Sequence, residues 1–294
     1  MPAQGLLLGV DGGGTRCRAR LTDASGARLG EGIAGPANIR FGLERSFSAA
    51  LDASREALRQ AGLGRRDLAR VVACLALAGA SEPSDLAAAQ AHEHPFARLV
   101  VTSDAHAACI GAHGGGDGGV VVVGTGSVGW AEIAGRQYRV GGWGLPVSDE
   151  GSGAWLGCEA LRRALWAHDG RIPWTDLLTT LFRGFQCDPH AVVRWAAQAA
   201  PRDFATLAPQ VVEHAARQDA TAVELMRLAA AQVDALAARL MAFGVERLTL
   251  TGGLAPFIEP WLGTGTKQHL VAAAGDALDG ALQLARAAAG ALAA

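Results

Sequence analysis

Three glycine-rich turns hold most of the residues that could do chemistry in this chain of 294 residues. They cover residues 11–15, 124–127 and 251–253, and each follows a short apolar run. Glycine lets the backbone approach a ligand closely and turn its N–H groups toward an anion, and threonine and serine add hydroxyl donors. One such turn is weak evidence because glycine is ordinary in hairpins, but three together indicate phosphate binding. None fits a P-loop, and the first turn lies in a hairpin, unlike a dinucleotide fingerprint.

Two aspartates near these turns could act in catalysis. Asp104 follows the apolar run 99–102 and precedes a helical stretch. Ligands bind at the carboxyl ends of strands in α/β sheets, where a carboxylate can accept a proton from an attacking hydroxyl. Aspartate is equally common as a helix N-cap, so spacing alone leaves both roles open. Asp11 could likewise close an Asx-turn or hold the waters of a Mg²⁺ ion, which prefers oxygen ligands.

The elements around the turns form a repeat. Residues 6–33 read as strand, glycine turn, strand, turn, strand, and residues 119–140 repeat that order. Residues 41–62 show helical spacing, and apolar runs alternate with helical segments after them, which indicates an α/β fold with parallel strand pairs. Residues 153–243 are rich in Ala and Leu and predict a mostly helical half, before a last strand at 247–250. A repeated subdomain indicates two duplicated lobes that face each other.

The composition argues against several classes of protein. Half of the residues are hydrophobic, and 26 basic residues nearly balance 28 acidic ones, which disfavours disorder and a nucleic-acid binder. No uncharged run reaches the about 20 apolar residues of a membrane span, and no signal-peptide pattern is present. The five cysteines are scattered singly, which disfavours a disulfide framework and a zinc site. We expect a cytoplasmic protein with no nucleic-acid and no membrane partner.

The order and spacing of the turns resemble the sugar kinase, actin and Hsp70 superfamily. Residues 9–15 look like its first phosphate motif, residues 122–127 like its second, and residues 250–253 like its adenosine motif. Within that superfamily, Asp-Gly-Gly-Gly-Thr with Gly-Thr-Gly-Ser is similar to the BadF/BadG/BcrA/BcrD ATPase family, which includes N-acetylglucosamine kinases and glucosamine kinases. Residues 141–144 and 148–153 resemble the sugar-site segment of those kinases.

The resemblance implies a role for each motif residue. Asp104 aligns with the catalytic base of N-acetylglucosamine kinases, and Asp11 with a residue that holds Mg²⁺ through water. The ATP phosphates are expected to bind Gly12, Gly13, Gly14, Thr15, Gly124, Thr125, Gly126 and Ser127. The adenosine is expected to lie near Gly252 and Gly253. The sugar is expected to contact Asn38, Asp104, Gly142, Trp143 and Asp149.

The resemblance also implies a fold and an activity. The expected fold is α/β, with two duplicated actin-like (ribonuclease H-like) lobes, a mixed sheet in each and an interlobe cleft. We expect lobes at residues 1–115 and 116–294, the second with a helical insertion and a last helix, about 276–292, that packs back toward the first. The implied enzyme uses ATP and Mg²⁺ to phosphorylate the C6 hydroxyl of N-acetylglucosamine, and it acts as a homodimer. Glucosamine is the alternative acceptor, because the sequence does not show the pocket that would distinguish the acetyl group.

Two further classes resemble this group. ATPase activators of dehydratases and reductases share the phosphate motifs, but they hold a bridging iron–sulfur cluster with cysteines from two subunits. The solitary cysteines here, among them Cys17 and Cys158 within predicted elements, make that class the less favoured alternative. A non-catalytic sugar sensor is disfavoured because Asp11 and Asp104 are both present.

Overall fold

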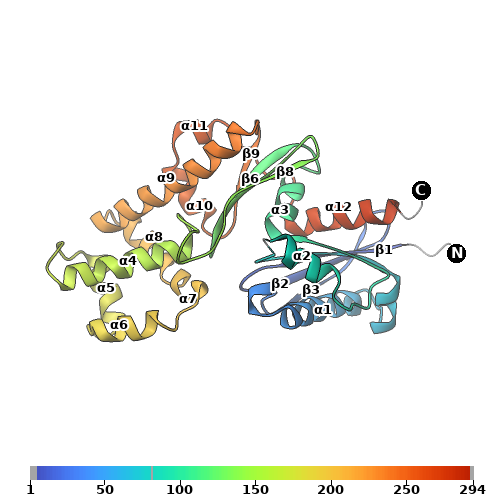
Figure 1. The fold of residues 1–294 in the computed structure, drawn as a ribbon, viewed down its shortest axis with the longest axis horizontal. Coiled ribbons are helices and arrows are strands. Elements are labelled where there is room, and N and C mark those ends of the chain that lie inside the picture. Colours follow the sequence, from blue (N-terminus) through green and yellow to red (C-terminus); the bar gives the residue numbers. More distant parts are fainter. Residues whose placement is uncertain (1–4, 81, 292–294) are drawn as a thin grey trace. The chain divides into compact units, whose positions relative to one another are not determined.

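The computed structural model describes residues 5–80 and 82–291, so the first four residues of the expected first lobe and Leu292 of the expected last helix lie outside it. The chain forms two compact units (Figure 1). Unit 1 comprises Met1–Val120, Ala131–Gln137 and Ala272–Ala294, and unit 2 comprises Val121–Trp130 and Tyr138–Val271. Within the described ranges, no helix is both long and apolar enough to cross a membrane.

Unit 1 is built on a five-stranded mixed sheet with the strand order β3-β2-β1-β4-β5. The strands are β1 (Leu6–Gly12), β2 (Cys17–Thr22), β3 (Arg28–Ala34), β4 (Val71–Leu77) and β5 (Arg98–Ser103). β1 pairs antiparallel with β2 and parallel with β4, and β4 pairs parallel with β5. The carboxyl ends of β1, β4 and β5 therefore lie in one row, with Gly12 beside Leu77 and Leu77 beside Ser103.

Helices cover both faces of this sheet because its central strands are apolar on both sides. Leu6, Leu8 and Val10 pack in one core with α1 (Leu43–Gln60), whereas Leu7 packs in a second core with α12 (Ala277–Gly290). This alternation follows the two-residue period of a strand. Figure 1 shows α1 in blue and α12 in red on opposite sides of the sheet.

The helix that begins with Asp104 is held against α12 at backbone contact. A side chain on Gly280 of α12 would collide with the Ala107 carbonyl of α3 (Asp104–Ala112). A side chain on Gly111 would collide in the same way with the Asp276 carbonyl. Only glycine permits such an approach, so these two positions lock α3 onto α12. The remaining elements of unit 1 are η1 (Ile39–Phe41), η2 (Arg65–Arg70) and α2 (Pro83–Gln90).

A second sheet has four strands in the order β8-β7-β6-β9. They are β6 (Gly118–Val123), β7 (Ser127–Ile133), β8 (Arg136–Gly141) and β9 (Leu248–Thr251). Unit 2 is otherwise helical, with α4 (Gly153–His168), α5 (Asp176–Gly184), α6 (Pro189–Ala196), α7 (Pro201–Ala205), α8 (Ala208–Ala216), α9 (Ala220–Ala242), α10 (Ala255–Ile258), η3 (Glu259–Trp261) and α11 (Thr264–Lys267). Tyr138 of β8 stacks on Phe243 at the end of α9, with ring centroids 4.6 Å apart.

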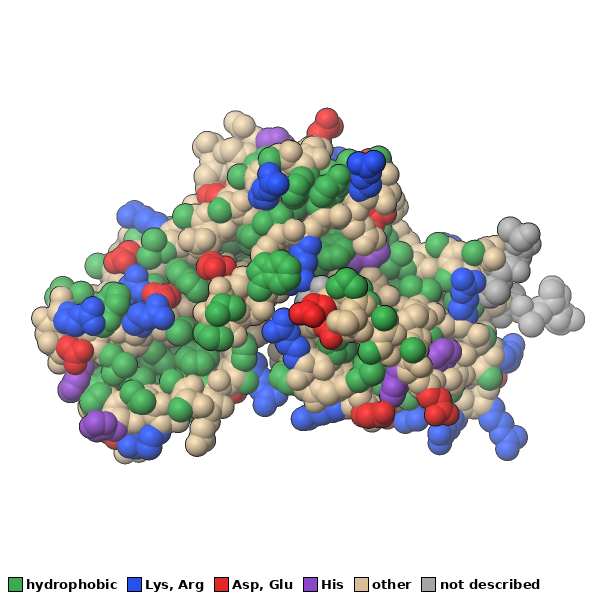
Figure 2. Space-filling model, in the orientation of Figure 1, with side chains coloured by type: hydrophobic (Ala, Val, Ile, Leu, Met, Phe, Trp, Pro, Cys, Tyr) green, Lys and Arg blue, Asp and Glu red, His purple; other side chains and the backbone are tan. Residues whose placement is uncertain are grey.

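The expected repeat of strand, glycine turn, strand, turn and strand is present as β1 to β3 and as β6 to β8. The second sheet ends one strand sooner than the first: beyond β9 it continues only as an isolated parallel bridge between Leu248 and Leu270. Basic and acidic side chains are interspersed on the face drawn in Figure 2, as the near balance of charge leads one to expect. The predicted α/β fold class, with a mixed sheet in each half, is confirmed.

Candidate functional site

The first glycine turn joins β1 to β2 at the carboxyl edge of the sheet in unit 1. Gly13 N–H donates to the Arg16 carbonyl at 3.0 Å and closes the turn. A side chain on Gly12 would lie 2.9 to 3.0 Å from atoms of Leu77 and Ala37, whereas one on Gly14 would meet only the Asn38 amide, at 3.9 Å. Gly12 thus packs the turn onto the sheet, while the backbone at Gly14 stays open to a ligand.

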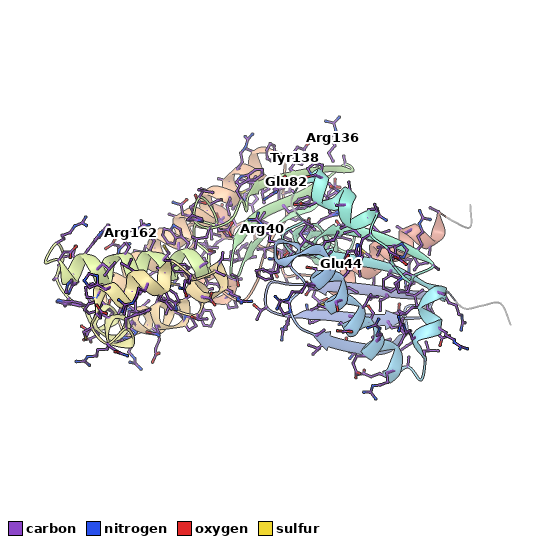
Figure 3. The ribbon with its side chains drawn as sticks, turned by 60° about the horizontal axis from the view of Figure 1, so that its bottom comes forward. Arg40, Glu44, Glu82, Arg136, Tyr138 and Arg162 are labelled. Carbon is purple, nitrogen blue, oxygen red and sulfur yellow. The ribbon has the colours of Figure 1, made fainter. Side chains whose placement is uncertain are left out.

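Asn38 lies at the same edge, between the first turn and the end of β4. Its backbone forms a parallel bridge with Ala78, and its side-chain Oδ1 accepts the Arg40 N–H at 3.0 Å (Arg40 is labelled in Figure 3). A side chain on Gly79, where φ is +78°, would collide with that same Oδ1. Asn38 therefore covers Gly79 and presents its amide next to Gly14, as a sugar- or phosphate-contacting group would.

Asp104 opens α3 directly after β5, but it is not the N-cap. That position belongs to Ser103, whose hydroxyl accepts the His106 N–H at 3.1 Å. Asp104 is half-buried in the first turn, and its Oδ1 accepts the Ala105 N–H at 2.9 Å. The alternative interpretation of Asp104 as the N-cap is therefore wrong.

Asp11, at the end of β1, belongs to an ion-pair network. Arg18 on β2 contacts Asp11 Oδ2 at 2.7 Å and Asp276 Oδ2, at the N-cap of α12, at 3.0 Å. Burial alone would lower the pKa of Arg18, but its hydrogen bonds and the two carboxylate charges raise it. Burial would raise the pKa of Asp276, but the Asp279 N–H and the charges of Arg18 and Arg20 hold it below its usual value.

This arrangement suits a Mg²⁺ ion. The contacts from Arg18 engage only Oδ2 of Asp11, so Oδ1 stays outside the ion pair. Mg²⁺ is usually bound through one or two carboxylates together with substrate phosphates and waters. A single carboxylate oxygen beside a phosphate-type turn meets that requirement.

The second glycine turn joins β6 to β7 in unit 2, and the first residues of α4 hydrogen-bond to it. The Gly124 and Thr125 carbonyls accept the N–H groups of Gly153 and Ala154 at 2.8 and 3.1 Å. The Ser127 hydroxyl is buried and donates to the Glu150 carbonyl at 2.7 Å. Ser127 therefore holds the 148–152 loop, while Thr125 is the more accessible hydroxyl of this turn.

Asp149 links this turn to the segment expected to bind sugar. It is buried with a φ of +66°, and its Oδ1 accepts the Gly144 N–H at 2.9 Å. A side chain on Gly126 would lie 2.5 Å from Asp149 Oδ2, so this glycine makes room for the carboxylate. Trp143 is 59% exposed, and the Arg139 guanidinium lies 4.2 Å from its ring centroid. The indole is thus an accessible aromatic surface that a cation already stacks on.

The third turn begins at Thr251 and lies beside the end of β6. Gly252 has a φ of +103°, and a side chain there would collide with the Val123 backbone. Leu254 N–H donates to the Val123 carbonyl at 3.0 Å, so residues 252–254 adjoin the strand that leads into the second turn. Gly253 has open space around its Cα and is the position that a ligand could approach.

The structure thus places the predicted residues in two groups. In unit 1 it brings together the first turn, Asp11, Asn38 and Asp104 at one sheet edge. Asp11 and the turn lie at the end of β1, Asp104 follows β5, and Asn38, which comes after β3 in the chain, is bridged to Ala78 just beyond β4. In unit 2 it brings together the second and third turns, Gly142, Trp143 and Asp149. Two surface hollows of unit 1, of about 450 and 440 Å³, lie elsewhere and include none of these residues.

Arg18 is the supporting residue that sequence reasoning missed. The signal was the alternation of two arginines with the buried Cys17, Ala19 and Leu21 along one strand. A strand paired with β1 in a hairpin must place one of those arginines beside Asp11. The pairing of Asp11 with Arg18 is the result.

The chain is similar to several characterised proteins. It is 39% identical over 278 residues, 95% of both chains, to the glucosamine kinase GspK of Vibrio cholerae. It is 29% identical over 170 residues, 56% of this chain and 55% of the relative, to an N-acetylmuramic acid/N-acetylglucosamine kinase of Clostridium acetobutylicum. A Chromobacterium violaceum structure, provisionally assigned as an N-acetylglucosamine kinase, superposes with a TM-score of 0.91 at 36% identity, covering 97% of this chain and all of that one.

These relatives confirm the predicted enzyme class, a phosphotransferase with an alcohol group as acceptor. The family model described as the BadF/BadG/BcrA/BcrD ATPase family matches residues 8–257. The chain therefore belongs to the BadF/BadG/BcrA/BcrD ATPase family.

Proposed function

We propose that this protein is a hexosamine kinase that transfers the γ-phosphoryl group of ATP to the C6 hydroxyl of N-acetylglucosamine or glucosamine. One observation carries the proposal: Asp104, Asn38 and the first glycine turn lie at the ends of three neighbouring strands, β5, β4 and β1, at one edge of the sheet in unit 1. A proton acceptor, a polar side chain and a phosphate-type turn are the parts that phosphoryl transfer to a sugar hydroxyl requires.

The base, the sugar hydroxyl and the phosphate-binding turn each have one role in the reaction. The sugar 6-hydroxyl oxygen attacks the γ-phosphorus, its proton passes to the Asp104 carboxylate, and the bond to the β-phosphate oxygen breaks to release ADP. The N–H groups of the first glycine turn stabilise charge on the phosphates. Most of the acceleration in such reactions comes from positioning and electrostatics, which suits a site built from backbone turns and one carboxylate.

Mg²⁺ would be held at Asp11, through water, where Arg18 fixes the orientation of the carboxylate. When bound, the ion supplies positive charge to the phosphate oxygens. The role of this chain's residues is to keep one carboxylate oxygen available next to the turn.

Two acceptors are candidates, each favoured by a specific similarity. N-acetylglucosamine is favoured by the Chromobacterium violaceum structure, and glucosamine by the Vibrio cholerae relative, which matches at 39% identity over nearly the full chain. An ATPase activator is disfavoured by the cysteines. Cys17, Cys74 and Cys109 are buried, and burial raises the pKa of each thiol to about 12, which suits core packing and not a cluster shared between subunits.

The test is ADP release from Mg-ATP with N-acetylglucosamine, glucosamine, N-acetylmannosamine, glucose and no sugar. Asp104→Asn is expected to lower kcat by about 10²- to 10⁴-fold, the usual contribution of a general base. Asp85→Asn is the matched control, because Asp85 also lies in the first turn of a helix, α2, and is not among the predicted site residues. Equal ADP release with and without sugar would refute the kinase proposal and favour an ATPase.

A further inference from the structure

A buried histidine lies two residues after the proposed base, in the same helix. His106 lies in the first turns of α3 and is 8% exposed. Its Nδ1 lies 2.6 Å from the Thr102 hydroxyl, and its Nε2 lies 2.9 Å from Glu132 Oε2 and 3.1 Å from the Gln137 amide. β5 and β7 each contribute one hydrogen-bond partner, Thr102 and Glu132, so both ring nitrogens are engaged from different elements.

The hydrogen-bond partners of His106 determine the orientation of its ring and which ring nitrogen carries a hydrogen. A carboxylate only accepts hydrogen bonds, so Nε2 carries the hydrogen that points to Glu132. The Gln137 amide nitrogen is also a donor, so it bonds to the same Glu132 Oε2, at 3.5 Å, and not to the ring. Nδ1 then faces the Thr102 hydroxyl, which can donate to a neutral ring or accept from a charged one. In either protonation state the imidazole is held at both ends, as an oriented group is.

His106 is tied twice to the residues just before Asp104. Its side chain bonds to Thr102, and its backbone N–H bonds to the Ser103 hydroxyl. Asp104 therefore lies in the chain between the two residues that His106 holds and the rest of α3. Any loosening of the His106 ring therefore acts on the turn that carries the proposed base.

We propose that Thr102, His106 and Glu132 form a positioning chain that sets the orientation of the Asp104 carboxylate toward the sugar hydroxyl. This inference rests on the proposed kinase function. The chain does not touch substrate: Glu132 holds His106, His106 holds the end of β5, and the first turn of α3 keeps Asp104 in place. Displacing a catalytic group by about 1 Å can cost about a hundredfold in rate, so a modest loss of orientation is measurable.

The test compares Thr102→Val, which replaces the hydroxyl by a methyl group of similar size, with Thr102→Ser, which keeps the hydroxyl. We expect Thr102→Val to lower kcat about tenfold with an unchanged KM for ATP, and Thr102→Ser to retain most of kcat. Glu132→Gln, which keeps an acceptor oxygen, is expected to fall between them. Thr249→Val is the matched control, because Thr249 is equally buried and its hydroxyl donates to the Val271 carbonyl at 3.1 Å in unit 2.

Two results separate positioning from plain stability. If Thr102→Val and Thr249→Val lower Tm alike and both keep the wild-type kcat, the chain is structural and the proposal is overturned. Hydrogen exchange of residues 104–108 in the full-length protein gives a readout that needs no turnover. Faster exchange there in Thr102→Val supports the ordering of the Asp104 turn by the chain, and unchanged exchange overturns the proposal. A wild type that phosphorylates no sugar would instead overturn the kinase function, and with it the role of the chain in catalysis.

Discussion

The modules β1 to β3 and β6 to β8 share one order of elements, yet different partners support their glycine turns. The turn after β1 is supported by the backbone segments that follow β3 and β4, because the Gly13 and Gly12 carbonyls accept the N–H groups of Ala37 and Ala78. The turn after β6 is supported by the start of α4 and by the Asp149 side chain. A repeated backbone module can therefore be held by unrelated contacts, and the side chains it presents diverge accordingly.

The chemistry of the two turns differs in the same way. The first carries a carboxylate, Asp11, in an ion pair with Arg18, and two further parallel strands lead from it to Asp104. The second carries hydroxyls, and its sheet has only β9 and a single bridge beyond β6. Under the proposed function, the metal carboxylate and the base both belong to unit 1.

The largest effect is expected at the third turn, in unit 2. Gly252→Ala would place a methyl group against the Val123 backbone at a φ of +103°, so strain and overlap together should destabilise the protein by about 3 kcal/mol. Gly253→Ala is the matched control, because no atom lies within 4 Å of its added Cβ. Urea unfolding measures both, and equal midpoints would contradict this reading of the turn.

The next largest effect is a difference in stability between alanine substitutions at Gly12 and Gly124, the first glycines of the two phosphate turns. Gly12→Ala brings a methyl group within about 3 Å of Leu77 and Ala37, and we expect a loss of about 1–3 kcal/mol. Gly124→Ala has nothing within 4 Å and should cost less than about 0.5 kcal/mol. Thermal unfolding of the two variants compares the modules directly, and a reversed order would show that the turns are packed alike.

The sequence predicted the repeat and the glycine turns because both rest on local signals, strand period and glycine clusters. Local spacing left the role of Asp104 open between base and N-cap, and only the family resemblance favoured the base. It did not show that Gly12 and Gly252 are packing positions while Gly14 and Gly253 are open. That difference depends on neighbours such as Leu77 and Val123, which are distant in sequence, and no local pattern reports it.

The supporting residues were hidden for a related reason. Arg18 meets Asp276 across 258 positions of sequence, and His106 meets Glu132 across 26. The alternation along β2 indicates an arginine beside Asp11, but no local pattern indicates that Arg18 also meets Asp276 or that His106 meets Glu132.

A smaller effect is expected from the ion pair of the first turn. Arg18→Met removes the charge that holds Asp11 and should weaken Mg²⁺-dependent ADP binding about tenfold, the lower range for a residue that orients a metal-holding carboxylate. Calorimetric titration of ADP with and without Mg²⁺ measures this without turnover. Arg194→Met is the control, because its ion pair with Asp188 lies on the surface of unit 2. Equal losses with and without Mg²⁺ would indicate a general effect on the turn.

The smallest effect concerns two helix N-caps, Asp276 in unit 1 and Asp219 in unit 2. Both have a folded pKa below the usual 3.8, so each stabilises the fold above that pH and loses this contribution as the pH falls through its lower folded value. Asparagine keeps either cap but removes the charge, so Asp276→Asn and Asp219→Asn should each reduce the loss of unfolding free energy as the pH falls.

The two N-caps differ in what lowers the pKa of the aspartate. The charges of Arg18 and Arg20 act on Asp276, whereas backbone N–H groups and the Thr175 hydroxyl oppose the effect of burial on the pKa of Asp219. Because 1 M salt shortens the screening length to about 3 Å, it should reduce the Asp276 contribution and spare that of Asp219. Urea midpoints between about pH 3 and pH 6 at low and high salt measure the difference, and equal salt dependence would mean that the arginines of unit 1 add nothing beyond the cap.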